Sequence, residues 1–130
     1  MKCILLPIKP KFVEEIRIGN KLYEYRKAIH KDSNIKKILI YSSFPVKKIV
    51  AISSIEAILC NSPENIWEST YLHSGITKNF FDKYFNGCPI AYAIKLKDIS
   101  FYEKSRELSE LGLKSAPQSF QYIELPESFL

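Results

Sequence analysis

The sequence holds only four glycines and has no repeat, no low-complexity stretch and no glycine-rich phosphate loop. These absences argue against a disordered chain, a repeat protein and the common nucleotide-binding loops. No run of about 18 apolar residues occurs, so we expect no membrane span and no membrane partner. The apolar stretch after Met1 stops at Pro7, which is too short for a signal peptide. We therefore expect a cytoplasmic protein.

Cysteine is also scarce, and Cys3, Cys60 and Cys88 lie far apart in the sequence. None of them belongs to a CxxC pair, so neither a zinc site nor a redox motif is predicted. Free thiols packed as small apolar groups explain them better. The sequence thus predicts no metal and no other cofactor.

The chain has 130 residues, of which 46% are hydrophobic, enough for one domain spanning 1–130 with a real core. Charge is unevenly spread. Residues 1–48 hold 12 Lys and Arg against 4 Asp and Glu, whereas residues 49–130 hold 7 against 10. A basic end of this strength suggests an anionic partner such as nucleic acid, with a solvated surface as the alternative.

Hydrophobic patterns predict about six short strands interleaved with short helices. Strands are expected at 3–6, 22–27, 38–41, 49–59, 90–96 and 119–125. Helices are expected at 10–18, after the caps Ser62 and Thr77, and at 103–111. Regular βαβ units would need a helix after each strand, and several of the predicted strands follow one another without a helix. The order of elements therefore favours an α+β fold built as a small mixed barrel.

The most informative segment is 19–26, in which Gly19, Lys21, Glu24 and Arg26 form a G-x-K-x-x-E-x-R pattern at the start of a strand. Glu24 and Arg26 share one strand face and can form an ion pair over a cleft. Arginine offers a planar fork for a phosphate or a base edge, and lysine offers a point charge. The alternative is a surface charge ladder of little energetic value.

This pattern resembles the ASCH domain family, whose fold is similar to the PUA domain. Three further segments support the resemblance in the expected order: 8–12, 40–43 with Pro45, and 116–122. The resemblance implies a PUA-like β-barrel of about six strands with flanking short helices and a basic cleft that binds RNA or a nucleotide. The residues implied in binding are Lys9, Lys11, Lys21, Glu24, Arg26, Tyr41, Ser42, Lys47, Lys48, Gln118 and Ser119.

Two enzyme activities known in the superfamily are the alternative to a purely binding or regulatory role. Hydrolysis of N4-acetylcytidine uses a lysine, matched by Lys21, and a threonine nucleophile, whose position holds Glu24, which cannot attack as a hydroxyl. RNA cleavage needs a cation and a proton-transfer group, for which Tyr41, Lys47 and Ser119 are candidates. A third alternative is a regulator that binds a small molecule or a protein in the same cleft.

Glu56 lies in the long apolar segment 49–59, where it shares a predicted strand face with Ile52, Ser54 and Ile58. A carboxylate on a mostly apolar strand face is either a pocket acid with a raised pKa or a paired structural charge. We expect the pocket acid, which would also match the glutamate of the acetylcytidine hydrolases.

Overall fold

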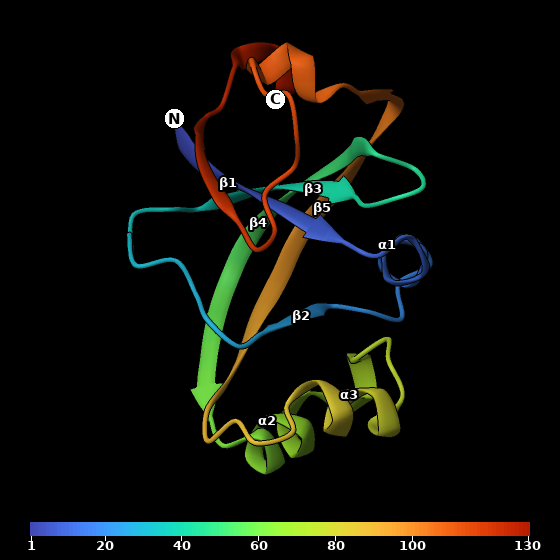
Figure 1. Cartoon of the computed structure of the whole chain (residues 1–130), viewed down its shortest axis with the longest axis vertical. Helices are drawn as coiled ribbons and strands as arrows, with labels where there is room; N and C mark the ends of the chain where they lie inside the picture. Colours follow the sequence, from blue (N-terminus) through green and yellow to red (C-terminus); the bar gives the residue numbers. More distant parts are fainter.

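The computed structural model describes residues 1–130, which form six strands and three α-helices with short 3₁₀ turns between them (Figure 1). The strands are β1 (Lys2–Ile8), β2 (Tyr23–Arg26), β3 (Lys37–Ser42), β4 (Lys48–Asn61), β5 (Ala91–Arg106) and β6 (Gln121–Glu124). The helices are α1 (Pro10–Arg17), α2 (Pro63–Thr70) and α3 (Lys78–Tyr84).

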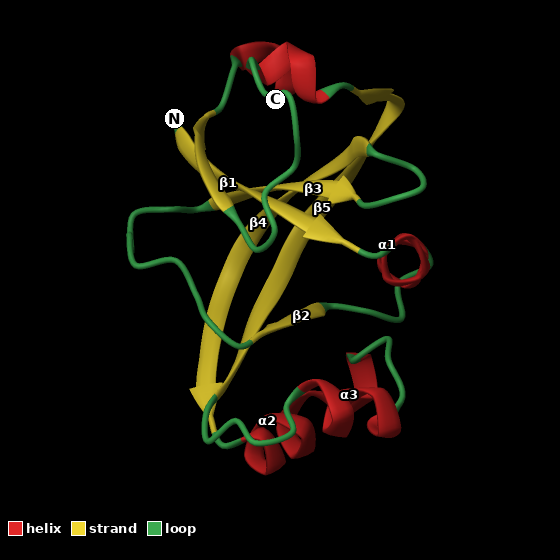
Figure 2. Cartoon of the chain, viewed as in Figure 1, coloured by secondary structure: helices red, strands yellow, loops and turns green.

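All six strands belong to one mixed sheet in the order β2-β5-β4-β3-β1-β6 (Figure 2). Only β1 and β3 run parallel; every other neighbouring pair is antiparallel. The predicted α+β class with six strands is therefore confirmed. The closed barrel is not, because no backbone ladder joins the edge strands β2 and β6.

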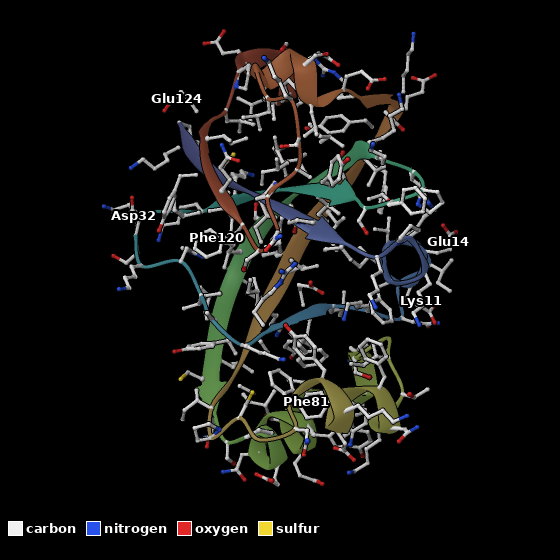
Figure 3. All side chains as sticks on the ribbon, in the orientation of Figure 1. Lys11, Glu14, Asp32, Phe81, Phe120 and Glu124 are labelled. Atoms are coloured by element: carbon white, nitrogen blue, oxygen red, sulfur yellow. The ribbon has the colours of Figure 1, made fainter.

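The core divides according to which element covers the sheet. Val13 and Ile16 of α1 pack on residues of β1, β3, β4 and β5, while Leu125 and Phe129 cover a second cluster. A third cluster lies between β2, β5 and the helices α2 and α3, and Figure 3 shows Phe81 reaching from α3 toward the sheet. This third cluster holds α3 close to the strand that carries the ionic motif.

Local chemistry places the helices as the sequence predicts. The Ser62 hydroxyl accepts a hydrogen bond from the Asn65 amide at 3.3 Å at the start of α2, and Thr77 caps α3 through the Phe80 amide at 3.1 Å. Gly19 takes a φ of +90° beyond α1, where a side chain would be strained. None of the α-helices combines the length and the apolar composition that a membrane-spanning helix requires.

The helix predicted at 103–111 is wrong. Strand β5 continues to Arg106, where it still pairs with Ile49 of β4, and only Leu108–Leu111 form a 3₁₀ turn. The alternating charges of this segment resemble helical i,i+4 pairs, but cross-strand pairing with β4 decides the conformation.

Candidate functional site

A hollow of about 200 Å³ opens between the end of β1, strand β2 and the helices α1 and α3. Its charged lining consists of Lys9, Lys21, Glu24 and Arg26, and its apolar walls are completed by Pro7, Ile8, Phe12, Tyr25, Ile76, Phe80 and Tyr84. We call this the first hollow. The segment 19–26 thus turns its ionic side chains into a concave site rather than onto a flat surface.

Three charges of the motif form one cluster in this hollow. The Glu24 carboxylate lies 3.0 Å from an Arg26 guanidinium nitrogen and 3.7 Å from the Lys21 ammonium. Their side chains are only 1% (Lys21), 9% (Glu24) and 12% (Arg26) exposed. Two cations thus share one carboxylate away from bulk water, which leaves the cluster with a net positive charge when Lys21 is protonated.

Lys21 is held from several sides. Its ammonium donates a 2.9 Å hydrogen bond to the Ser74 carbonyl and lies 4.8 Å from the centre of the Tyr25 ring. Burial lowers the pKa of Lys21, and the facing Glu24 carboxylate opposes that shift. The neighbouring Gly75 is required by this packing, since a Cβ there would lie 2.3 Å from the Lys21 Cβ.

Arg26 connects the two edges of the sheet. From the end of β2 its guanidinium donates to the Pro7 carbonyl of β1 at 2.5 Å and to the Ser119 carbonyl, just before β6, at 3.2 Å. Its Nε is buried and has no hydrogen-bond partner. A buried N–H without a partner is an exception in a folded protein, and this one can meet a ligand only if the Arg26 side chain moves.

A second hollow, of about 460 Å³, adjoins the first and shares Pro7 and Lys9 with it. Its polar and charged lining includes Tyr41, Lys47, Lys114 and Gln118, and Phe44 lies at its side. No acidic side chain lines it, so it is the more cationic of the two. The hollow therefore favours an anionic ligand over a cationic one.

Tyr41 is 97% buried as a residue and lines the second hollow, and its hydroxyl is not one of the buried polar atoms that lack a partner. Burial raises the pKa of Tyr41; the Glu107 carboxylate acts in the same direction and the Lys48 ammonium against it. The hydroxyl therefore stays protonated at neutral pH and is a hydrogen-bond donor. Lys47 is exposed beside it, with a backbone φ of +56°.

The other predicted binding residues fall at different distances from these hollows. Lys9 and Gln118 line the second hollow, while Lys11 borders a neighbouring depression on the far side of Phe12 and Phe80. Ser119 is exposed and touches the site through its carbonyl only. Ser42 and Lys48 line neither hollow, because Ser42 is buried within β3 and Lys48 forms an ion pair with Glu107.

The expectation that Glu56 is a pocket acid is wrong. Its side chain is 41% exposed, pairs with Lys95 at 2.7 Å and lines none of the described hollows. The Lys95 hydrogen bond lowers the pKa of Glu56 rather than raising it. Register shifts in the β4–β5 ladder, between Ile52 and Ser54 and between Ile55 and Ala57, disturb the alternation on which the expectation was based.

The lining residues that the sequence did not indicate include three aromatic residues and one lysine: Phe44, Phe80, Tyr84 and Lys114. Phe81 and Phe85 are buried in the core, whereas Phe80 and Tyr84 are half-buried and line the first hollow. The helical spacing of α3 was the available signal, because a short helix lying beside a cleft divides its aromatic residues between two faces.

No three His, Cys, Asp or Glu side chains gather closely enough to hold a metal ion. The charged groups of the two hollows are instead lysines, one arginine and one carboxylate.

We compared the chain with known proteins. No protein-family model matches the chain. An ASCH domain-containing ribonuclease of Zymomonas mobilis is 26% identical over 117 residues, which cover 90% of this chain and 77% of that protein. The large ribosomal subunit protein uL22 of Ureaplasma parvum is 28% identical over 92 residues, and the chain spans 30% of its length.

The solved structure of ASCH from Zymomonas mobilis superposes with a TM-score of 0.84 at 24% identity, covering 93% of this chain and 87% of that one. Two further structures of that protein, also at 0.84, carry a tyrosine-to-phenylalanine and a serine-to-alanine substitution. At this level of identity the likeness shows a shared fold across nearly the whole chain.

Proposed function

We propose that the chain, which is similar to the ASCH domain proteins of Zymomonas mobilis, is an ASCH domain protein that binds RNA, with the phosphate backbone along the second hollow and one base in the first. The single observation that carries the proposal is the pair of adjoining hollows that share Lys9, one lined by lysines without any acid and the other by a buried Lys21–Glu24–Arg26 cluster.

The first hollow supplies both kinds of partner that a base edge needs. The Glu24 carboxylate can accept hydrogen bonds and the Arg26 guanidinium can donate them, while Phe80 and Tyr84 offer aromatic walls. Its volume of about 200 Å³ is below the usual range for ligand pockets and fits a single ring system rather than a helix. A base entering it must be unpaired.

The second hollow supplies charge. Lys9, Lys47 and Lys114 line it, so binding there would release counterions from the RNA backbone. RNA affinity measured by fluorescence anisotropy at rising salt tests this account. Each lysine–phosphate contact steepens the logarithmic salt slope by about 0.7–0.9. We expect Lys47→Ala to flatten the slope by about one contact.

Lys104→Ala is the matched control, because Lys104 is exposed on β5 and lines neither hollow. It should leave the slope unchanged. Salt-independent binding by the unaltered protein, or equal effects of the two lysine variants, would remove the electrostatic account and with it the proposed phosphate path.

RNA cleavage is the second candidate. It is favoured by the relative named a ribonuclease and by Tyr41, which lines the hollow that also holds Lys47. In this role Lys47 would stabilise charge on the phosphate while protonated Tyr41 donates a hydrogen bond to it.

Incubation with end-labelled RNA separates cleavage from binding alone. Tyr41→Phe removes one oxygen and should abolish cleavage while leaving RNA affinity within a few-fold. The control is Tyr92→Phe on β5, which lies outside both hollows. Intact RNA after prolonged incubation with the unaltered protein would leave binding as the function. Equal activity of Tyr41→Phe and the unaltered protein would exclude Tyr41.

A further inference from the structure

Phe44 is the most exposed of the large apolar side chains, at 80%. It lies in the turn between β3 and β4, next to Lys47, and lines the second hollow. Burying a phenylalanine in the fold is worth about 1.5–3 kcal/mol, so the fold itself gains nothing from Phe44 where it stands. An exposed ring beside a lysine-lined hollow is therefore better explained by a ligand.

Phe80 forms a similar arrangement at the first hollow. The ring is half-buried and packs edge-on against Phe12, with 5.0 Å between the ring centres. The ammonium groups of Lys9 and Lys11 lie 5.2 and 5.1 Å from its centre. Phe80 also separates the first hollow from the depression bordered by Lys11. It is thus an aromatic surface between two cations at the mouth of a site.

The segments that carry the two rings lie on one side of the molecule. Figure 1 shows the β3–β4 turn, α1 and α3 along the same side, and Lys9, immediately before α1, lines both hollows. Lysines therefore stand next to each phenylalanine and between the two hollows. Proteins that hold single-stranded nucleic acid combine such a basic track with aromatic side chains on which successive bases stack.

Resting on the proposed RNA binding, we infer that Phe44 and Phe80 are base-stacking residues, which makes the ligand single-stranded RNA. A base stacks on Phe44 at the second hollow and another on Phe80 at the first, while Lys9, Lys11 and Lys47 meet the phosphates. Stacking uses the face that every base possesses, so these two contacts tolerate any sequence. The bases of a duplex are stacked on one another and cannot offer these faces.

Binding of a labelled single-stranded oligoribonucleotide, and of the same strand annealed to its complement, tests the inference by fluorescence anisotropy. We expect the single strand to bind more tightly. Phe44→Ala and Phe80→Ala should each weaken single-strand binding about 5- to 150-fold, the range of one lost base stack. The salt slope should not change, because no phosphate contact is lost.

Two controls keep the result interpretable. Leu72→Ala removes another exposed apolar side chain, 76% exposed and outside both hollows, and should not alter affinity. Phe44→Trp and Phe80→Tyr keep an aromatic face and should retain near-normal affinity. Because Phe80 packs on Phe12, thermal unfolding of the Phe80 variants establishes that they are folded.

An abasic nucleotide in the RNA gives a direct readout of stacking. At the position that contacts Phe44 it should weaken binding to the unaltered protein and cause no further loss with Phe44→Ala. Independent losses, or unchanged affinity of both alanine variants with a normal salt slope, would overturn the stacking inference and leave RNA binding standing. Absence of salt-dependent binding by the unaltered protein would instead refute the proposed function.

Exposed apolar rings also occur at contacts between proteins, and the same variants decide that point. If Phe44→Ala shifts the protein from dimer to monomer in sedimentation while RNA affinity is unchanged, Phe44 belongs to a contact between copies of the chain and the inference fails. A monomeric protein before and after the substitution, together with weakened RNA binding, supports stacking.

Discussion

Glu24 is the carboxylate on which the charge balance of the first hollow depends. It faces Lys21 and Arg26 in a space where all three side chains are nearly inaccessible to solvent. Removing one partner of a buried ionic group leaves the remaining charges uncompensated, which costs far more than the pair contributes when intact. The residue therefore has a structural role as well as its proposed contact with a base.

We predict that Glu24→Gln lowers the free energy of unfolding by about 3 kcal/mol or more. Urea unfolding followed by circular dichroism measures this loss. Glu56→Gln is the matched control, because Glu56 pairs with Lys95 on the exposed part of β4 and should change stability very little. Equal losses for the two variants would contradict the view that burial makes the Glu24 cluster sensitive.

The difference between Glu24 and Glu56 also marks how far single residues can be predicted from the sequence. The pattern at 19–26 correctly places Lys21, Glu24 and Arg26 together, because β2 is short, regular and follows directly from the turn at Gly19. Glu56 fails because irregularities in the β4–β5 ladder shift the register, and a one-residue shift moves a side chain to the other face.

At the scale of elements, the bridge between Lys21 and Ser74 joins the start of the motif to the segment before α3. Gly75 adopts a φ of +64° there and approaches the Lys21 side chain so closely that no Cβ fits. The glycine thus lets two segments far apart in sequence come together and form the mouth of the first hollow.

We predict that Gly75→Ala destabilises the protein more than Gly87→Ala does. Both glycines have positive φ, so both substitutions carry a backbone cost of about 1–2 kcal/mol. Only Gly75→Ala adds a clash, because nothing lies within 4 Å of a Cβ at Gly87. Thermal unfolding of the two variants gives the difference; a larger loss for Gly87→Ala would show that the Lys21 contact is not tight.

Most elements follow from local sequence signals, and the exceptions have one cause. Caps at Ser62 and Thr77 and the proline at the start of α1 mark the helices correctly. Strand β5 extends to Arg106 because β4 pairs with it, and no local pattern reports a partner so distant in the chain. The same applies to the second hollow, where β1, the β3–β4 turn and the segment before β6 converge.

The whole molecule carries several buried groups that resist losing a proton. Burial raises the pKa of Cys3 from 9.0 to about 12, and that of Tyr25 and Tyr102 from 10.0 to about 12. In the unfolded chain these groups ionise first, so between the two pKa values the unfolded state binds fewer protons. The contribution of these groups to the free energy of unfolding is fully present below pH 9 and is lost as pH rises toward 12.

We predict that the free energy of unfolding falls most steeply above pH 10.5. Folding lowers the pKa of Lys21, so up to pH 10.5 this group makes the free energy of unfolding rise with pH. Above pH 10.5 Lys21 is deprotonated in both states and contributes no further change. Each of the three acids adds a slope of up to about 1.4 kcal/mol per pH unit. Urea midpoints from pH 8 to pH 11.5 measure the curve, and Tyr102→Phe should make it shallower. A midpoint that stays level to pH 11.5 would contradict the burial of these groups.

Arg26 connects the two edges of the open sheet by side-chain hydrogen bonds rather than by a backbone ladder. Where a closed barrel would join its edge strands by a row of backbone bonds, a single guanidinium spans from β2 to Pro7 and Ser119. These hydrogen bonds can break without disrupting the pairing of any two strands. A ligand that draws the guanidinium toward itself would release the Ser119 carbonyl, which follows Gln118 of the second hollow directly in the chain.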